Sequence, residues 1–548
     1  MNTKILIAIS VGLLGLVFVT FSQPPSPVKP SVETPNNQSK IITNVDIFDG
    51  EKWLIQHDIA FKNGFIEAVG IDLDLEITPA NIISGTGLYL IPGLIDAHTH
   101  AWDNALEQAV AFGVTTELDM FTNNAFAITQ RKQRAHHDKN IQQADLFSAG
   151  TLVTAPEGHG TEYGFPIPTI SNASQATDFV SARIAEGSDY IKIVFDVDAD
   201  GKRMSSIDVA TLSAVIDAAH QQDKLAVVHI ANLKSAQAAV TAGADGLVHG
   251  FFDHDQGIIE LSKNMQQRFI IPTLSILASM AGVDTTTELI NDFEGNERDI
   301  SAVKGNLIGL RSANANIKIF EQAINNIGLL AKSGVTILAG TDAPNPGTAH
   351  GISLHGELAL LVKAGLTPDQ ALMAATSNVA KTFNLSQRGF IKVGMKADLV
   401  LLNKDPRINI RHTRAINTVY KNGFAITASN ESASNKVLNQ ATLLGDFEHD
   451  LASSLTTSWQ ISTDQMFQGN SKANISQHDG VITIIGSVGD KFSYPWAGIY
   501  LPFAPDQKTA FDISKLTTLE FRAMASAGKY KLMLFAASRP MRPIEVSF

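Results

Sequence analysis

The chain has 548 residues, of which 44% are hydrophobic and 18% charged, so it can bury a sizeable core and is not intrinsically disordered. Its length indicates about three to five domains, or one large barrel with appendages. The 42 basic and 54 acidic residues leave a net charge of −12, which argues against a nucleic-acid-binding protein. The sequence contains no Cys, which excludes disulfides, thiolate catalysis, zinc-finger sites and iron–sulfur clusters. Any metal must therefore be held by His, Asp, Glu or a modified side chain.

Residues 1–22 have the pattern of a secretory signal peptide. Lys4 precedes an uncharged apolar run over residues 5–21, and cleavage is expected after Ser22. An uncleaved membrane anchor is the alternative, because 17 apolar residues lie at the lower limit for crossing a bilayer. The five prolines in residues 23–40 indicate an extended linker. We therefore expect an exported protein, either periplasmic or anchored in a membrane and facing outside the cytoplasm.

Residues 91–384 alternate short apolar strands with longer amphipathic stretches, such as 205–222 and 234–242, a pattern typical of βα units and a parallel sheet. The strand candidates are residues 94–100, 114–120, 145–152, 189–195, 225–231, 246–250, 269–274 and 335–341. Eight such units predict an α/β fold, specifically a (β/α)8 TIM barrel. The connection before the last strand has about 60 residues, too many for one helix, so we expect extra helices above the barrel mouth, where they could act as a lid.

Both flanks of the barrel region return to short strands. Residues 41–90 carry hairpin turn signals at Asp49-Gly50 and Asn63-Gly64, and residues 385–430 have the same strand-and-turn character. We expect these two segments to form one composite small β-sandwich. Residues 443–548 predict a separate C-terminal β-sandwich, which we expect to be incomplete if the chain stops within its last strand.

Metal-competent side chains recur where the predicted barrel strands end. His98 and His100 alternate along one strand, so they face the same side and can chelate one cation. Lys192 lies in an apolar strand, where an unpaired ammonium is costly to bury, so it is either paired with a carboxylate or carboxylated by CO2 into an anionic metal bridge. Later strands end in His229, His249 and Asp342. Each histidine alone could be an ordinary core residue, but active sites of barrels form where all these strands end.

This ordered set resembles the metal-dependent amidohydrolase superfamily, in particular its imidazolonepropionase-like and Xaa-Pro dipeptidase-like branch. The resemblance covers about residues 41–430. It also includes LIPGLIDAHTH at 90–100, GVTTELDM at 113–120, AGTDAP at 339–344, AGLTPDQALMAATSNVAKTFNL at 364–385 and GFIKVGMKADLVLL at 389–402.

The resemblance implies a hydrolase with two divalent metal ions, and the His-rich set favours zinc. One ion would be held by His98, His100 and Asp342, and the other by His229 and His249. Carboxylated Lys192 and a hydroxide would bridge them, and Asp342 would pass the hydroxide proton to the leaving nitrogen. A mononuclear form, with Lys192 unmodified, is the alternative.

Three further residues are candidates for substrate contact. His159 and Tyr163 lie in a Gly-rich loop after the third strand, and His350 follows Asp342. The loop with His159 and Tyr163 could instead be purely structural. His355 is expected to lie on a helix.

Residues 443–548 resemble the complex I intermediate-associated protein family, a jelly-roll β-sandwich similar to carbohydrate-binding modules, through LGDFE at 444–448, Trp459 and DQM at 464–466. The resemblance implies that this domain binds glycan or protein. The whole sequence predicts an exported, metal-dependent amidohydrolase that hydrolyses a C–N bond of a small peptide-like amide, such as a dipeptide. A cyclic amidohydrolase of the imidazolonepropionase type and a non-catalytic glycan- or protein-binding scaffold are the alternatives; the complete ligand set argues against the scaffold.

Overall fold

The computed structural model describes residues 3–8, 39–75, 78–137, 139, 141–161, 167–196, 204–253, 257–294, 300–307 and 316–426, and a series of short segments between residues 436 and 547. Four predictions fall largely or wholly outside these residues. They concern Tyr163, most of the signal segment at 1–22, most of the linker at 23–40 and most of the C-terminal sandwich at 443–548.

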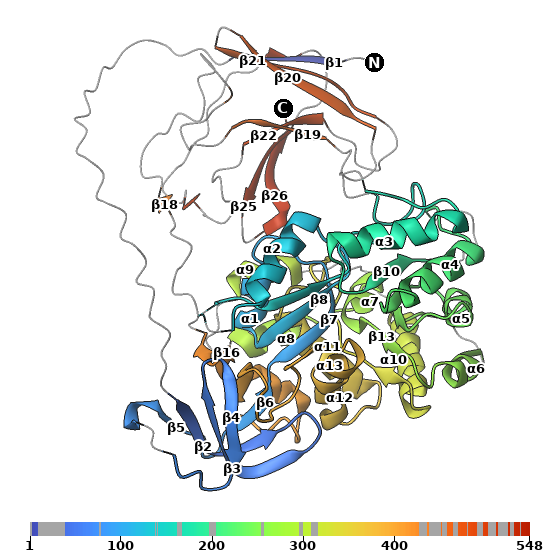
Figure 1. Cartoon of the computed structure of the whole chain (residues 1–548). Helices are drawn as coiled ribbons and strands as arrows, with labels where there is room; N and C mark the ends of the chain where they lie inside the picture. Colours follow the sequence, from blue (N-terminus) through green and yellow to red (C-terminus); the bar gives the residue numbers. More distant parts are fainter. Residues whose placement is uncertain are drawn as a thin grey trace, which may run out of the picture.

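Parallel strands form the centre of the molecule, in one sheet of three strands and one of five (Figure 1). The first sheet contains β7 (Leu94–Thr99), β8 (Val114–Asp119) and β9 (Asp145–Ser148). The second contains β10 (Ile191–Val194), β11 (Ala226–His229), β12 (Gly246–Val248), β13 (Phe269–Ile271) and β14 (Thr336–Ile337). Most of these residues are buried, as expected for parallel strands that are covered on both faces.

Backbone hydrogen bonds join the two sheets at both of their edges. The Val153 amide, just after β9, donates to the Lys192 carbonyl of β10 over 2.8 Å. On the other side, the Asp342 amide, after β14, donates to the His98 carbonyl of β7 over 2.9 Å. Parallel bridges occur at both places. Each edge strand of one sheet is therefore attached to an edge strand of the other.

Helices follow the strands and cover their outer faces (Figure 1). The first six are α1 (Ala105–Ala111), α2 (Asn124–Arg134), α3 (Ala176–Glu186), α4 (Val209–His220), α5 (Leu233–Thr241) and α6 (Gly257–Asn264). The helices predicted at 205–222 and 234–242 correspond to α4 and α5. Helix α4 begins at Val209, later than the predicted residue 205, because Asp208 is its N-cap and accepts a hydrogen bond from the Thr211 amide.

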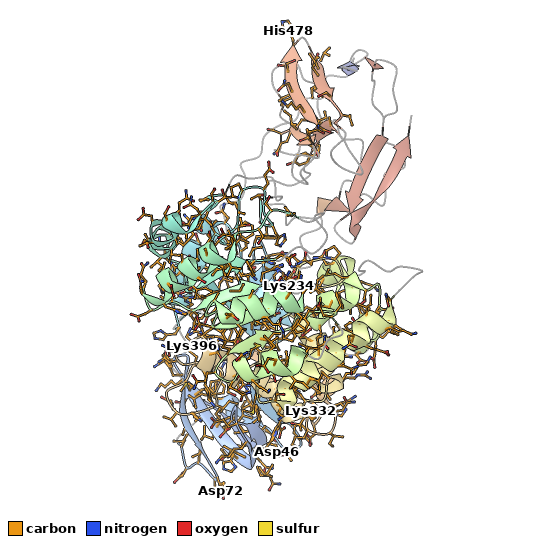
Figure 2. All side chains as sticks on the ribbon, turned by 90° about the vertical axis from the view of Figure 1, so that its right-hand side faces the viewer. Asp46, Asp72, Lys234, Lys332, Lys396 and His478 are labelled. Atoms are coloured by element: carbon orange, nitrogen blue, oxygen red, sulfur yellow. The ribbon has the colours of Figure 1, made fainter. Side chains whose placement is uncertain are left out.

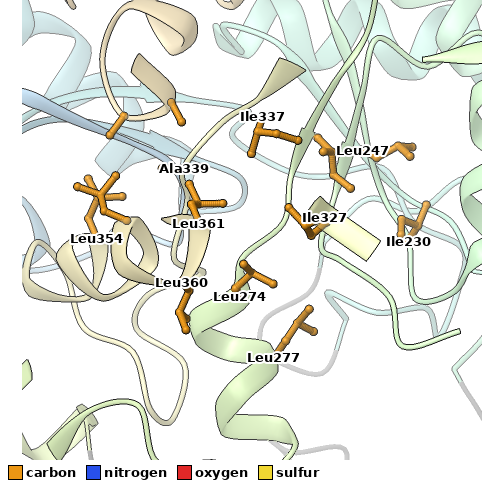
Figure 3. Packing of buried hydrophobic residues seen from close by; sticks show 14 of the residues in the cluster. Ile230, Leu247, Leu274, Leu277, Ile327, Ile337, Ala339, Leu354, Leu360 and Leu361 are labelled. Atoms are coloured by element: carbon orange, nitrogen blue, oxygen red, sulfur yellow. The ribbon is translucent and has the colours of Figure 1, made fainter. Parts of the chain in front are cut away.

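Several helices fill the long connection between β13 and β14. They are α7 (Leu274–Met280), α8 (Thr287–Glu294), α9 (Ser301–Leu307) and α10 (Ile317–Lys332). After β14 come α11 (Ile352–Lys363), α12 (Pro368–Ala374) and α13 (Ser377–Thr382). Leucines and isoleucines from α7, α10 and α11 form part of one buried cluster with Ile337 of β14 (Figure 3). The connection thus contributes to the core of the parallel sheets.

A third sheet, called the mixed sheet because its strands pair both parallel and antiparallel, combines strands from both flanks of the parallel region. The first flank supplies β2 (Lys40–Phe48), β3 (Trp53–Lys62), β4 (Phe65–Gly70), β5 (Ile82–Ser84) and β6 (Tyr89–Pro92). The other flank supplies β15 (Leu399–Leu402), β16 (Ile416–Lys421) and β17 (Phe424–Ala425). β15 pairs antiparallel with β6, so Leu399 lies opposite Pro92. Asn63 and Gly64, with φ of 51° and 85°, make the turn between β3 and β4.

Buried ion pairs connect this mixed sheet to the parallel strands. Asp145, the first residue of β9, pairs with Arg388, and its Oδ2 lies 3.1 Å from Nζ of both Lys396 and Lys421. Nζ of Lys421 also lies 3.0 Å from Asp398 Oδ2. Figure 2 shows Lys396 on the side of the molecule that faces the mixed sheet, where Asp46 and Asp72 lie. The ligand-bearing strand ends lie at the opposite end of the parallel strands.

The remaining strands form small sheets. β1 (Thr3–Ala8) pairs antiparallel with β21 (Val481–Ser487), which also pairs with β20 (Lys472–His478), at whose end His478 is labelled in Figure 2. The others are β18 (Lys436–Val437), β19 (Gln460–Thr463), β22 (Ala497–Tyr500), β23 (Phe511–Asp512), β24 (Met524–Ala525), β25 (Lys531–Ala536) and β26 (Arg539–Ser547). Among the helices that the structure describes, none has the length and apolar character needed to cross a bilayer.

Candidate metal centre

Side chains from five strands meet where the parallel strands end. His98 lies in β7 and His100 directly follows it; Lys192 lies in β10 and His229 ends β11; His249 follows β12 and Asp342 follows β14. Parallel strands present their carboxyl ends at one edge, which brings these residues together across long sequence separations.

Asp342 lies at the centre of the cluster. Its Oδ1 lies 3.1 Å from Nε2 of His98 and 3.1 Å from Nε2 of His100. One ligand atom from each of His98, His249 and Asp342 lies within 4.8 Å of the others, a spacing that one cation can span. The resemblance assigned His249 to a second ion; its ring centroid lies 4.6 Å from that of His229 and 5.0 Å from that of His98, so it neighbours both proposed ligand sets.

The imidazoles form a continuous row. Ring centroids are 5.0 Å apart for His98 and His249, 4.6 Å for His249 and His229, and 5.2 Å for His229 and His159. His159, predicted as a substrate contact, therefore lies beside the ligand cluster at its His229 end. Tyr163 of the same predicted loop is outside the described residues.

Lys192 is 3% exposed and makes no ion pair with a carboxylate among the residues that the structure describes. Burial lowers the pKa of Lys192 to about 7, although the charges of Asp342 and Asp119 act in the opposite direction. Of the two interpretations considered for this lysine, direct pairing with a carboxylate is therefore not found in the described part of the chain. A neutral amine is the form of lysine that can react with CO2.

Two of the ligand positions share an unusual backbone conformation. His249 and Asp342 have φ of 75° and 60°, in the left-handed region that side-chain-bearing residues rarely adopt. Strained backbone of this kind is concentrated at functional sites, because the surrounding structure must hold it in place.

Hydrogen bonds donated by Nδ1 orient two of the rings. Nδ1 of His100 lies 3.2 Å from the Phe121 carbonyl oxygen, and Nδ1 of His249 lies 2.8 Å from Thr273 Oγ1. An imidazole that donates through Nδ1 keeps the lone pair on Nε2, which is the usual arrangement of a metal ligand.

The protonation states of three histidines and of Asp342 suit a metal site; for His100, burial lowers the pKa but the neighbouring Asp342 and Asp119 outweigh it and raise that pKa. Burial lowers the pKa of His98 and of His229 well below the ordinary value, and that of His249 to about 3, so all three rings are neutral. Burial acts to raise the pKa of Asp342, but the close approach of the His98 and His100 ring nitrogens outweighs burial and lowers that pKa well below its ordinary value. Neutral imidazoles and an ionised carboxylate are the forms that bind divalent cations.

The polar atoms of this cluster fit a bound cation. Both ring nitrogens of His98 and Oδ1 of Asp342 are buried without a hydrogen-bond partner among the described residues, so the 3.1 Å approach of His98 to Asp342 lacks hydrogen-bond geometry. Buried polar groups in native proteins are nearly always satisfied. A divalent cation bound by Nε2 of His98 and by Oδ1 of Asp342 would satisfy these two atoms, and such a donor set suits zinc.

His350, a predicted substrate contact, is placed elsewhere. It is 3% exposed, and its Nδ1 lies 2.9 Å from Oε1 and 3.1 Å from Oε2 of Glu117. Glu117 also accepts a hydrogen bond from Thr99, the residue between His98 and His100. The His350 ring is thus bound to the buried carboxylate of Glu117 in β8 and does not join the row of imidazoles.

Sequence reasoning missed residues that surround the ligands. Trp102 stacks on His100, with ring centroids 6.4 Å apart and planes inclined by 27°, and is 41% exposed. Asp96 is buried and accepts hydrogen bonds from Thr341 and from the His98 amide. Both lie within two or three positions of a predicted ligand in the sequence, and that proximity was the signal that could have found them.

A cluster of imidazoles and a carboxylate at the ends of parallel strands defines a metal-dependent hydrolase. Residues 89–426 match the amidohydrolase family, and the chain belongs to that family. It is 26% identical to the imidazolonepropionase of Geobacillus sp. (strain WCH70), over 74% of this chain and 95% of that protein.

Solved structures show the same fold. A Xaa-Pro dipeptidase with bound methionine superposes with a TM-score of 0.55 at 21% identity, covering 71% of this chain and 99% of that one. The Aspergillus niger ochratoxinase superposes with a TM-score of 0.54 at 19% identity, covering 71% and 96%. The chain is therefore an amidohydrolase-type hydrolase of C–N bonds, a family that uses divalent metals.

Proposed function

We propose that this protein hydrolyses the C–N bond of a small peptide-like amide at a centre of two divalent metal ions, with zinc as the expected metal. The observation that carries the proposal is the buried, unsatisfied pair of His98 and Asp342 within the row of imidazoles. The ligands in this proposal are His98, His100, Lys192, His229, His249 and Asp342.

In this proposal the two parallel sheets close into one (β/α)8 barrel, and the ligands lie at its mouth. The backbone hydrogen bonds that join the two sheets at both edges, from the amides of Val153 and Asp342, support the closure. A closed barrel would hold the strand ends rigidly, which a metal centre assembled from five strands requires.

Lys192 would be carboxylated and would bridge the two ions. Its burial without a carboxylate partner among the described residues supports this, because carboxylation turns an unpaired cation into an anionic ligand. A mononuclear centre with unmodified Lys192 is the alternative.

The protein residues have distinct roles in the proposed reaction. When bound, the divalent cations lower the pKa of a water molecule and polarise the amide carbonyl. The Asp342 carboxylate accepts the proton of the attacking water and delivers it to the leaving nitrogen. The Phe121 carbonyl and the Thr273 hydroxyl would hold His100 and His249 in place. His159 would contact the substrate, a role that its position beside His229 supports.

An imidazolonepropionase-type activity on a cyclic amide is the second candidate. It is favoured by the likeness to the Geobacillus enzyme over almost all of that protein's length. A non-catalytic role for the C-terminal segment, binding glycan or protein, stays a prediction.

An assay of the metal-loaded protein on a panel of substrates tests the proposal. The purified protein, loaded with Zn2+ or Mn2+, would be assayed on Xaa-Pro and other dipeptides and on cyclic amides. We expect hydrolysis of dipeptides and loss of it on removing the metal with a chelator. A protein that binds no divalent ion and hydrolyses no amide would refute the proposal. A Lys192→Ala variant with full metal content and activity would reject the bridging role while leaving a mononuclear hydrolase.

We also propose that the protein is exported, on the strength of the apolar run at residues 5–21 after Lys4. Cell fractionation and N-terminal sequencing of the purified protein test this. A mature chain that starts near residue 23 in the periplasm is expected, and an intact N-terminus in the membrane fraction would indicate the anchor instead.

A further inference from the structure

Thr273 is a strained residue beside one of the proposed ligands. It is fully buried and has φ of 48° and ψ of 49°, a left-handed conformation that is costly for a β-branched residue. Its Oγ1 lies 2.8 Å from Nδ1 of His249. Something in the surrounding structure must therefore hold this conformation against its cost.

Thr273 also stands at the start of α7, where a threonine ordinarily acts as an N-cap. A capping threonine has an extended backbone, and its hydroxyl accepts from an amide in the first helical turn. Thr273 has neither the extended backbone nor a capping hydrogen bond through its side chain. The first amides of α7 must therefore find another acceptor.

Glu357 of α11 is that acceptor. The Leu274 amide donates to its Oε1 over 2.8 Å, and the Ser275 amide donates to its Oε2 over 2.7 Å. The Ser275 hydroxyl donates to the same Oε2 over 2.8 Å. One carboxylate thus fixes the two peptide groups that follow Thr273.

The Glu357 side chain has a fixed position. It is fully buried, and the two helices that it joins share the same hydrophobic cluster. Figure 3 shows Leu274 and Leu277 of α7 close to Leu360 and Leu361 of α11. Movement of the carboxylate away from α7 would require these helices to separate.

We propose that Glu357 is a positioning residue for His249: it caps α7 in place of Thr273, and the freed Thr273 hydroxyl accepts a hydrogen bond from Nδ1 of His249. The Nε2 lone pair of His249 is then directed at the metal. This inference rests on the proposed function, because it requires His249 to be a metal ligand. It adds Glu357, which lies 83 positions from its amide partner Leu274 in sequence, to the machinery that shapes the site.

Zinc affinity is the direct measurement. Metal-free protein would compete with a chromophoric chelator for Zn2+, and the dissociation constants of wild type, Thr273→Val, Thr273→Ser and Glu357→Gln would be compared. Thr273→Val keeps the shape and loses the acceptor, so binding of the ion at His249 is expected to weaken by about 10- to 100-fold. Thr273→Ser keeps the hydroxyl and should bind like wild type. Glu357→Gln should weaken binding as Thr273→Val does.

Thr413→Val is a matched control. Thr413 is also fully buried, and its Oγ1 lies 2.9 Å from Nδ1 of His355, a histidine outside the ligand cluster. This substitution should lower the thermal stability of the metal-free protein about as much as Thr273→Val does, but leave its zinc affinity unchanged.

The double variant Glu357→Gln/Thr273→Val shows whether Glu357 affects zinc binding through Thr273 or independently of it. If Glu357 acts through Thr273, the double variant should bind zinc hardly more weakly than either single variant. Additive losses would overturn the role of Glu357. Equal affinities of the Thr273→Ser and Thr273→Val variants would overturn the proposal even if Glu357→Gln failed to fold. A wild-type protein that bound no zinc would instead refute the proposed function, and the positioning role with it.

Discussion

Gly340 lies directly against His98. A Cβ atom at position 340 would fall 2.8 Å from the His98 backbone nitrogen and 2.9 Å from its Cβ, closer than real Cβ atoms approach. It would also fall 2.5 Å from Cγ2 of Ile271. Only a residue without a side chain lets the segment after β14 come this close to the ligand strand.

Gly340→Ala is therefore expected to displace His98. The substitution should cost about 1–3 kcal/mol of unfolding free energy through overpacking and weaken zinc binding. Urea unfolding and the chelator competition would measure the two effects. Gly498→Ala is the control, since a Cβ at position 498 meets nothing within 4 Å. Unchanged zinc affinity in Gly340→Ala would mean that His98 does not depend on this contact.

The stability of the metal-free protein should depend on the protonation of Glu357. Burial raises the pKa of Glu357 from 4.5 to about 7, although the hydrogen bonds from Leu274 and Ser275 lower it. Since the folded pKa is the higher one, the contribution of Glu357 to stability is complete below about pH 4.5 and is lost as the pH rises through 7.

Urea unfolding at pH 5 and pH 8.5 tests this dependence. The stability of wild type relative to Glu357→Gln should fall over that interval by an amount on the order of 3 kcal/mol. A difference that stays constant with pH, or that grows as the pH rises, would show that the carboxyl group is not the one that titrates.

Lys421 should be essential for stability. It is fully buried, and its Nζ lies 3.0 Å from Asp398 Oδ2 and 3.1 Å from Asp145 Oδ2. Lys421→Met would leave buried carboxylates short of a partner and is expected to cost about 3–5 kcal/mol of unfolding free energy.

Lys381→Met is the comparison for Lys421→Met. Lys381 pairs with Glu51 at the surface, where each side chain is about half exposed, so its loss should cost no more than about 1 kcal/mol. Similar losses for the two variants would contradict the structural role of the buried network.

Trp102 should contribute to substrate binding without contributing to metal binding. Its indole is 41% exposed and stacks on His100, so one face is available beside the proposed reaction centre. Trp102→Ala is expected to raise KM for dipeptides with an aromatic side chain by about 2- to 10-fold and to leave zinc content unchanged. The comparison of aromatic with alanine-containing dipeptides is the internal control, since only the former should be affected.

Much of the parallel-strand region could be predicted because most of the short apolar strands are followed by a stretch with the pattern of an amphipathic helix. Strand boundaries were less predictable. The last strand was expected over 335–341, whereas β14 covers only Thr336–Ile337, because the residues beyond it bond individually to β7 at Ala97 and His98. Those contacts involve residues far away in sequence, and no local pattern encodes them.

The surroundings of the site were harder to predict than the ligand positions. His350 follows Asp342 closely in sequence, which suggested a place in the site, but the buried carboxylate of Glu117 holds its ring elsewhere. Glu357 lies in an ordinary helical pattern and acts on amides 83 and 82 residues away. Only the tertiary structure shows that this side chain serves another helix.

The pairing of β15 with β6 has a consequence for synthesis of the chain on the ribosome. β6 emerges early, but its partner emerges only after the whole parallel-strand region has been made. Until then the nascent chain presents an open strand edge, which favours pairing with other chains. Truncation before residue 399 would make that edge permanent, so shortened versions of this protein should aggregate even though every proposed metal ligand is present.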